Sequence, residues 1–263
     1  MTHDVISPID DRTAAGDGAD GLPVPGADWA LFLDVDGTLV ELAAEPDAVR
    51  VDARLIALLD ALRAQLGGAV ALVSGRTIAT LDALFAPLTL AAAGNHGLER
   101  RDSDGRLRRP DLPPEMAPVR AAMKRFAADH PGVNAEDKAL SVALHYRNRP
   151  EAAQPAAALA RGLVAQSGGK LIVQDGKMMV EVRPGRADKG TAIADFMDEP
   201  PFAGRVPVFI GDDVTDENGF RLVNALGGHS IRVGNGADTA AHYRVPDVGG
   251  VLRWLEGVTA AGD

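Results

Sequence analysis

Short apolar runs alternate along this chain with helix-like segments, and each run ends in polar residues. Residues 30–33 form one such run, which ends at Asp34, and residues 69–73 form another, which ends at Ser74. Between them, leucines recur at helical spacing over residues 55–66, up to a Gly-Gly pair. Apolar runs separated by amphipathic helices are typical of a parallel sheet with crossover helices. The sequence therefore predicts an α/β fold.

An interruption of this pattern predicts a second unit. Residues 98 to about 184 contain two hairpin-like pairs, with turns at Asp104-Gly105 and Asp175-Gly176, and two alanine-rich helical stretches. The α/β pattern then resumes with a helix over 188–197 and a strand over 206–210. Such an insertion can cover the strand ends like a lid. We expect a disordered tail at 1–28, a Rossmann-like core with a parallel sheet at 29–102 and 185–263, and an α+β cap domain at 103–184.

Composition narrows the possible partners and the compartment. The formal net charge of −10 argues against binding to nucleic acid or to anionic membranes, which both need an excess of Lys and Arg. No apolar run approaches the roughly 20 residues that a membrane-spanning helix needs. The absence of cysteine excludes disulfides, thiolate catalysis and cysteine zinc sites. We expect a cytoplasmic protein with a small-molecule substrate and without an obligate protein partner.

Two carboxylates follow the first apolar run, in the segment Asp34-Val35-Asp36-Gly37-Thr38. They come at the carboxyl end of the predicted strand, where open α/β sheets bind their ligands. One carboxylate can attack a phosphorus atom, while the other protonates the leaving group and later activates water. The plainer interpretation is an Asp-Gly turn that merely ends a strand. The buried run before Asp34 favours the catalytic interpretation.

A dense acidic cluster, GDDVTDE at residues 211–217, follows the predicted strand at 206–210. So many carboxylates at a buried strand end predict a bound cation. Mg²⁺ prefers hard oxygen ligands and usually takes one or two carboxylates together with phosphate oxygens. Asp34 and Asp212 are the candidate ligands, with Asp213 and Asp216 supporting them. The last two acidic residues of the cluster could instead cap the helix that follows.

Two further elements are suited to a phosphoryl group. Ser74 and Gly75 precede a predicted helix, and Lys189 opens another. Amides at a helix start and a point positive charge both stabilise the oxygens of a transferring phosphoryl group. Each element alone is weak support, because a Ser-Gly turn or a helix start is more often structural. Their weight comes from the order of all four segments along the chain.

In that order, the four segments resemble the four motifs of the haloacid dehalogenase superfamily, and the insertion is similar to the C2 type of cap found on sugar phosphatases. Residues 30 to about 255 resemble the trehalose-6-phosphate phosphatases more narrowly. The strings that carry this resemblance are SGR at 74–76, GNHGLE at 94–99, LHYR at 144–147, EVRP at 181–184 and GDDVTDE at 211–217.

The resemblance implies a role for each matching residue. Asp34 would be the nucleophile and Asp36 the general acid and base, and trehalose 6-phosphate would be hydrolysed through an aspartyl-phosphate. Mg²⁺ would be held by Asp34, the Asp36 carbonyl and Asp212, and the phosphate by Ser74, Gly75 and Lys189. The implied sugar-binding residues are Arg76, Asn95 and His96 on the core and Glu136, Lys138, Arg147 and Glu181 on the cap.

Three alternatives stay open from the sequence. Residues 136–138 could form a solvated loop, and His145 with Arg147 could face outward from an edge strand. A phosphatase for sucrose phosphate or mannosyl-phosphoglycerate would share the core chemistry and differ in the cap. A non-catalytic sugar-phosphate sensor would only bind. The presence of all four expected residues argues against it: Asp34, Asp36, Lys189 and Asp212.

Overall fold

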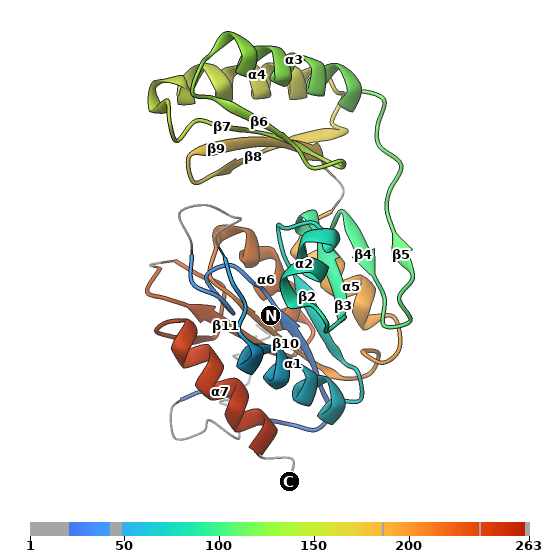
Figure 1. The fold of residues 1–263 in the computed structure, drawn as a ribbon. Helices are drawn as coiled ribbons and strands as arrows, with labels where there is room; N and C mark the ends of the chain where they lie inside the picture. Colours follow the sequence, from blue (N-terminus) through green and yellow to red (C-terminus); the bar gives the residue numbers. More distant parts are fainter. Residues whose placement is uncertain (1–20, 43–48, 186, 237, 261–263) are drawn as a thin grey trace, which may run out of the picture.

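The computed structural model describes residues 21–42, 49–185, 187–236 and 238–260. It contains an eight-stranded and a four-stranded sheet, each covered by helices (Figure 1). The predicted α/β class is confirmed. Most of the expected tail, residues 1–20, lies outside the described residues. Among the described residues, no helix has both the length and the apolar composition that crossing a bilayer requires.

The larger sheet has the strand order β12-β11-β10-β1-β2-β3-β4-β5. The first six strands in this order run parallel, and β4 and β5 pair antiparallel at one edge. Its strands are β1 (Trp29–Leu33), β2 (Val70–Val73), β3 (Ala91–Gly94), β4 (Glu99–Arg101), β5 (Leu107–Arg108), β10 (Val206–Gly211), β11 (His229–Val233) and β12 (Tyr243–Val245).

The register of the central strands brings the motifs to one edge of this sheet. Leu33 of β1 lies opposite both Ile210 of β10 and Leu72 of β2. The three strands therefore end nearly level, and the amide of Asp34 donates to the carbonyl of Ile210 at 3.0 Å. All five residues of β1 are buried because helices cover both faces of the sheet, which explains the continuous apolar run.

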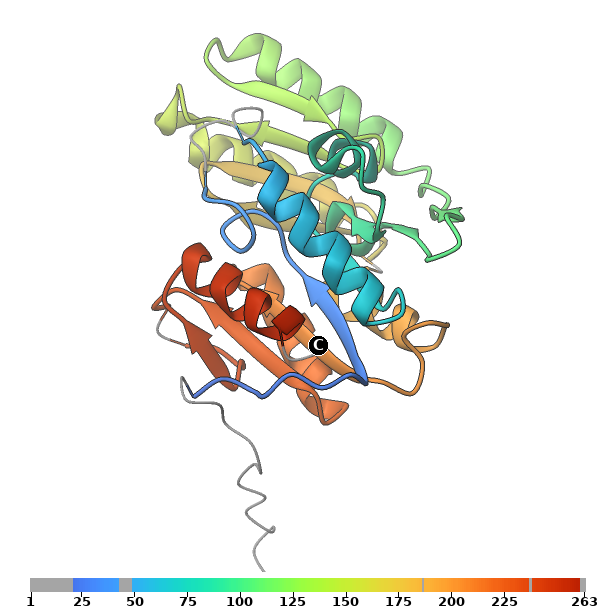
Figure 2. The same ribbon diagram turned by 60° about the horizontal axis from the view of Figure 1, so that its bottom comes forward.

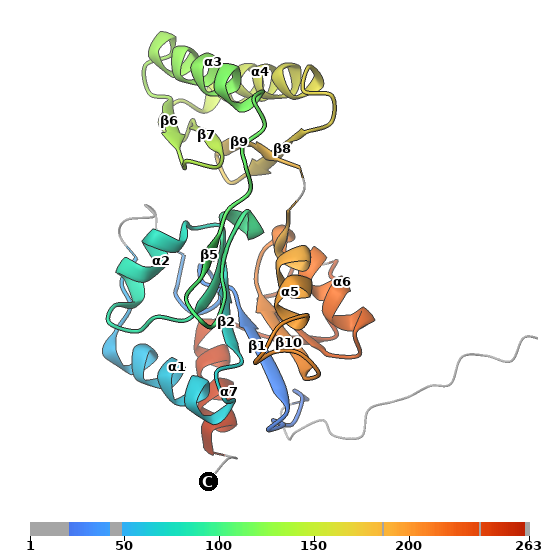
Figure 3. The same ribbon diagram turned by 90° about the vertical axis from the view of Figure 1, so that its right-hand side faces the viewer.

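Helices flank the larger sheet on both faces. Helices α1 and α7 contact each other on one face (Figure 2), and α5 and α6 contact each other on the opposite face (Figure 3). Helix α1 begins where Asp52 caps the amide of Leu55, and it ends before Gly67, whose φ of 59° suits glycine. The helices around this sheet are α1 (Ala53–Gln65), α2 (Ile78–Phe85), α5 (Lys189–Met197), α6 (Glu217–Ala225) and α7 (Val248–Ala260), with 3-10 turns η2 (Asn95–Gly97) and η4 (Val214–Asp216).

The smaller, antiparallel sheet has the order β6-β7-β9-β8 and lies between its two helices and the larger sheet (Figure 1). Val142, Leu144, Val180 and Val182 on one face are fully buried in a second hydrophobic core with α3 and α4. We call this unit the cap and the larger sheet with its helices the core. The cap elements are α3 (Met116–Asp129), β6 (Asn134–Asp137), β7 (Val142–His145), η3 (Pro150–Ala152), α4 (Ala153–Ala165), β8 (Leu171–Gly176) and β9 (Met179–Pro184).

Two expected turns lie differently in the structure. The hairpin around Asp104-Gly105 belongs to the core, because β4 pairs with β3 and thereby carries β5 onto the larger sheet. The inserted unit thus begins after β5 rather than at residue 103. Asp175 and Gly176 lie within β8, and the turn is Lys177-Met178, since Gly176 pairs with Met179.

Candidate active site

A buried ammonium joins two carboxylates at the level edge of the core sheet. Lys189, the first residue of α5, donates from Nζ to Asp34 Oδ1 at 2.8 Å and to Asp216 Oδ1 at 2.6 Å. All three side chains are almost fully buried. Burial alone would lower the pKa of Lys189, but the carboxylates of Asp216 and Asp34 outweigh it and raise that pKa. Lys189 is therefore charged at any working pH.

Negative charge exceeds positive charge at this point. Carboxylate oxygens of Asp34, Asp212 and Asp216 lie within 4.8 Å of one another. Burial, reinforced by the charge of Asp216, raises the pKa of Asp34 well above its usual range and that of Asp212 to about 6. Three carboxylates thus face the single ammonium of Lys189. A divalent cation with hard-ligand preference fits this donor set and would restore the balance.

Two glycines shape the space around these carboxylates. A Cβ atom at Gly37, whose φ is 80°, would overlap the carboxylate of Asp212. A Cβ atom at Gly211 would overlap the carboxyl group of Asp216. Only glycine lets the backbone come this close to the acidic side chains. The cradle is therefore built by the backbone of the two motifs as well as by their carboxylates.

Asp36, the expected acid and base, is held by Arg76. Nε and Nη2 of Arg76 donate to the two carboxylate oxygens of Asp36, both at 2.7 Å. This two-point contact fixes the plane of the carboxylate. The resemblance implied sugar binding for Arg76, and the structure brings its guanidinium onto the carboxylate of Asp36. The pairing could not be inferred from the sequence because the two residues come from different βα connections.

Ser74 and Gly75 form the turn between β2 and α2. Ser74 Oγ accepts from the amide of Arg76 at 3.1 Å, and the Ser74 carbonyl accepts from the amide of His96 at 2.9 Å. A Cβ atom at Gly75 would overlap the imidazole of His96. The expected phosphate-binding turn therefore packs directly against the loop that follows β3.

That loop contains Asn95 and His96, with left-handed φ values of 49° and 56°. The Asn95 amide donates to Glu99 Oε1 at 3.1 Å, the same oxygen that accepts from the amide of Ile78 at 2.8 Å. Glu99 Oε2 accepts from Arg109 Nε at 2.8 Å. Asn95 is thus tied into a buried network, with only its Oδ1 unpartnered among the described residues.

The cap presents a row of polar side chains on the face away from α3 and α4. The register places Glu136, Ala143, Glu181 and Gln174 directly opposite one another across the four strands, so they share this face. Glu181 is buried and accepts from Lys138 Nζ at 3.3 Å. The structure thus brings together three of the four expected cap residues.

The outer residues of this cap face are paired differently from the centre. Glu136 contacts His145 Nε2 at 2.8 Å, a contact that lowers the pKa of Glu136. Arg147 lies in the turn beyond β7 with an exposed side chain, and among the described residues it forms no ion pair with the acidic members of the row.

Gln174 and Arg183 belong to the same face and were missed by the sequence analysis. Alternation from Glu181 could have indicated Arg183, two residues further along β9.

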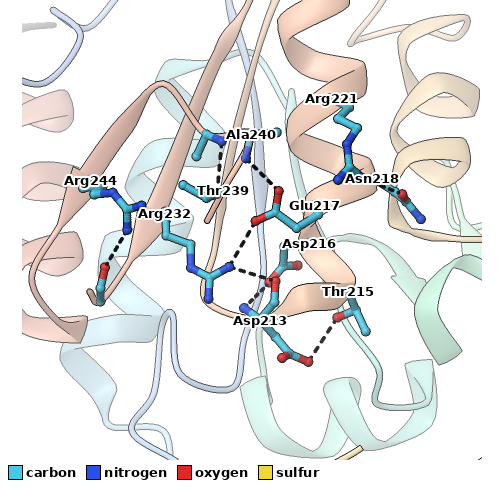
Figure 4. A network of polar contacts seen from close by, with 12 residues as sticks. Asp213, Thr215, Asp216, Glu217, Asn218, Arg221, Arg232, Thr239, Ala240 and Arg244 are labelled. Carbon is cyan, nitrogen blue, oxygen red and sulfur yellow. Dashed lines mark hydrogen bonds and ion pairs between the residues drawn. The ribbon is translucent and has the colours of Figure 1, made fainter. Parts of the chain in front are cut away.

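Residues of β11 and of the segment between β11 and β12 hold the acidic loop, residues 211–217, in place (Figure 4). Arg232 on β11 donates to the carbonyl of Asp213 at 3.3 Å and to Glu217 Oε1 at 3.2 Å. Glu217 Oε2 accepts from the amide of Ala240 at 2.8 Å. The amide of Asp213 donates to Asp216 Oδ2 at 2.8 Å, while its own carboxylate is exposed. Asp216, expected to support the site, therefore lies at its centre, and Asp213 contributes chiefly through its backbone.

Comparisons with known proteins find chains of similar sequence. The model of a family described as trehalose-phosphatase matches residues 32–248. A probable trehalose-phosphate phosphatase from Sinorhizobium fredii is 49% identical over 206 residues, which cover 78% of each chain. The trehalose-6-phosphate phosphatase of Escherichia coli is 42% identical over 240 residues, which cover 91% of this chain and 90% of that one.

Solved structures share the fold. A trehalose-6-phosphate phosphatase related protein superposes with a TM-score of 0.73 at 25% identity, covering 88% of this chain and 97% of the other. The C-terminal domain of Candida albicans trehalose-6-phosphate phosphatase gives a TM-score of 0.76 at 22% identity, covering 89% and 92%. A haloacid dehalogenase-like hydrolase from Bacteroides thetaiotaomicron gives 0.64 at 18% identity, covering 86% and 97%.

Proposed function

The chain belongs to the trehalose-phosphatase family and is a phosphatase, and we propose that it hydrolyses trehalose 6-phosphate to trehalose and inorganic phosphate. The observation that carries the proposal is the buried pairing of Asp34 with Lys189, beside a surplus of carboxylates. If Asp34 had a purely structural role, the ammonium of Lys189 would balance its charge, and two further carboxylates would not be needed beside it. The substrate is inferred from the relatives, which are a probable trehalose-phosphate phosphatase and a trehalose-6-phosphate phosphatase.

The reaction is proposed to run in two steps on Asp34. An oxygen of this carboxylate attacks phosphorus, the bond from phosphorus to the sugar oxygen breaks, and the carboxyl group of Asp36 gives its proton to the departing oxygen. Asp36 then takes a proton from a water molecule, whose oxygen attacks phosphorus. The bond from phosphorus to Asp34 breaks, which regenerates the Asp34 carboxylate and releases phosphate. Lys189 fixes Oδ1 of Asp34, so the second oxygen is the nucleophile. Arg76 orients Asp36 for both proton transfers.

The phosphate and the metal have separate proposed binding groups. Ser74, Gly75 and Lys189 hold the phosphoryl oxygens, and Mg²⁺ is held by Asp34, the Asp36 carbonyl and Asp212. When bound, Mg²⁺ supplies positive charge that keeps the carboxylates ionised and neutralises the phosphoryl oxygens. A side chain at position 37 would overlap the carboxylate of Asp212. Glycine there lets the backbone lie close to this carboxylate, which supports a site for such an ion.

The sugar is proposed to lie between the cap face and the core. Glu181 and Lys138, buried or half-buried and paired at 3.3 Å, can exchange their mutual contact for hydroxyl groups of a disaccharide. A site of charged groups rejects analogues that leave those groups unpaired. We propose that cap and core are separate domains, so that the cap can open for substrate exchange.

Phosphate release from a panel of sugar phosphates tests the proposed function. We expect Mg²⁺-dependent release from trehalose 6-phosphate at a rate well above that from sucrose 6-phosphate, mannosyl-3-phosphoglycerate or glucose 6-phosphate. Equal rates on trehalose 6-phosphate and glucose 6-phosphate would refute disaccharide recognition. Binding without any release would instead identify a sensor.

A further inference from the structure

A hydrogen bond between Gln174 and His96 joins the cap to the core. The side-chain amide of Gln174, on β8, lies 3.0 Å from Nε2 of His96. The carbonyl oxygen of the same amide accepts from Arg183 Nε at 2.7 Å. Because a guanidinium only donates, the amide nitrogen of Gln174 must face the imidazole, and Nε2 of His96 must accept. The contact therefore has a defined direction from Arg183 through Gln174 to His96.

The imidazole is in the protonation state that this contact requires. Burial, together with the positive charges of Lys189, Arg183 and Lys138, holds the pKa of His96 well below its usual range. A neutral ring with its proton on Nδ1 leaves the lone pair on Nε2 free to accept, although Nδ1 is buried without a partner among the described residues. The hydrogen bond is thus available throughout the neutral pH range.

Further contacts hold both ends of this hydrogen-bonded chain, Arg183 and His96, in place. Arg183 is buried, and its Nη1 donates to the carbonyl of Ala187 in the connection that leads to α5. His96 lies against Gly75 and donates its amide to the carbonyl of Ser74 at 2.9 Å. A displacement of the cap sheet would therefore break a contact that rests on the expected phosphate-binding turn.

We propose that Gln174, braced by Arg183, is a positioning residue that latches the cap onto His96 and so sets the sugar-binding face of the cap relative to Asp34. Among the described residues, the Gln174 side chain lies opposite Glu181 on the cap sheet but forms no hydrogen bond with the carboxylate cluster, with Lys138 or with Glu181. Through its hydrogen bond to His96, Gln174 holds the cap sheet in position against the core. The kinetic part of the inference rests on the proposed function, whereas the geometric part does not.

The kinetic test compares Gln174→Met, which keeps the side-chain length but removes both hydrogen bonds, with Gln154→Met at an exposed position of α4. For trehalose 6-phosphate we expect kcat/KM to fall roughly five- to tenfold in Gln174→Met, as loss of one hydrogen bond predicts. For p-nitrophenyl phosphate, which is too small to span cap and core, we expect a change below about twofold. Gln154→Met should match wild type. An unchanged kcat/KM for trehalose 6-phosphate, or equal losses on both substrates, would overturn the proposal.

A double-mutant cycle tests whether Gln174 acts through His96. If it does, the His96→Ala and Gln174→Met double variant should lose no more kcat/KM than the worse single variant. Losses that multiply would show that the two residues act separately and would overturn the latch.

A distance measurement tests the geometry without any substrate. The chain has no cysteine, so Ala61→Cys on α1 and Ala158→Cys on α4, both exposed, would carry the only two spin labels. We expect one narrow distance population in the labelled wild type, and a broader one extending to longer distances after Gln174→Met. Identical distributions would overturn the latch. Failure of the proposed function is distinguishable, because it would remove turnover of trehalose 6-phosphate in the wild type while leaving this comparison intact.

Discussion

Arg76 grips both carboxylate oxygens of Asp36 at 2.7 Å, which ties the turn after β2 to the turn after β1. A guanidinium can make this two-point contact, whereas a lysine ammonium cannot reproduce its geometry. The orientation of the proposed acid and base therefore depends on a residue from another strand end.

Replacing Arg76 by Lys should lower kcat about tenfold or more and change KM less. A misaligned Asp36 loses part of the roughly 10²–10⁴-fold rate enhancement that general acid–base catalysis typically contributes. Steady-state kinetics on trehalose 6-phosphate measure the split. Arg63→Lys, which alters the exposed pair with Asp60, is the matched control and should behave like wild type. A change confined to KM would return Arg76 to substrate binding alone.

Replacing Asp34 by Asn should abolish turnover, by at least about three orders of magnitude, as loss of a nucleophile typically does. Substrate should still bind, because the phosphate- and sugar-binding groups remain. Phosphate release and calorimetric binding measure the two effects. Asp129→Asn, at an exposed position at the end of α3, is the control. Substantial activity in Asp34→Asn would exclude covalent catalysis by this residue.

Mg²⁺ should stabilise the folded protein, because three carboxylates share one ammonium. At ten times its Kd, a ligand that binds only the folded state adds about 1.4 kcal/mol to the free energy of unfolding. Scanning calorimetry with Mg²⁺ and with EDTA should show a higher Tm in wild type with the metal, and EDTA should remove activity. The Tm increase should shrink in Asp212→Asn. The same increase in both proteins would place the ion elsewhere.

Replacing Glu99 by Gln should lower the free energy of unfolding by about 1–3 kcal/mol, the cost of leaving a buried partner unsatisfied. Its two oxygens serve three donors, from Ile78, Asn95 and Arg109, and glutamine has only one acceptor oxygen. Urea denaturation measures the change. Glu151→Gln, at an exposed ion pair, should stay within about 0.5 kcal/mol of wild type.

Asp137 should make the stability of the cap depend on pH. Burial alone would raise its pKa, but the hydrogen bond from Lys124 and the charge of Arg120 outweigh burial and lower the pKa. A carboxyl group with a lowered pKa in the folded state stabilises the fold above its ordinary pKa of about 3.9. That stabilisation is lost as the pH falls through the folded-state value. The Tm difference between wild type and Asp137→Asn should therefore be largest near pH 6 and shrink as the pH falls below the ordinary carboxyl pKa of about 3.9; a constant difference would contradict this.

The parts of the site that the sequence predicted are those with local signals. Asp34, Asp212 and Lys189 each sit where an apolar run ends or a helix begins, and parallel strands bring such ends together. For Asp216 the sequence predicted only a supporting role, with a helix cap as the alternative, because its burial under Lys189 depends on residues far away in the chain. The contact between Gln174 and His96 was not predictable for the same reason. Its two residues are 78 positions apart, one on the cap sheet and the other in the turn η2 of the core.

The hairpin of β4 and β5 shows a related limit of local patterns. Its turn at Asp104-Gly105 was recognisable, but the partner sheet was not, because pairing of β4 with β3 is decided by how the chain reverses over residues 95–97. The inserted unit was recognised from the change of rhythm, whereas its first residue depended on this pairing.

The tethering of the two connections between cap and core has a consequence for protein engineering. Arg109 on the first connection reaches Asn95 through Glu99, and the second reaches His96 through Arg183 and Gln174. Both tethers end on adjacent residues of one loop. A chimaera that imports a foreign cap at residues 110–184 would keep the first tether and discard the second. A cap that is grafted to change the substrate range should therefore keep glutamine and arginine at the positions of Gln174 and Arg183. Alternatively, residue 96 of the core should be replaced to match the new cap.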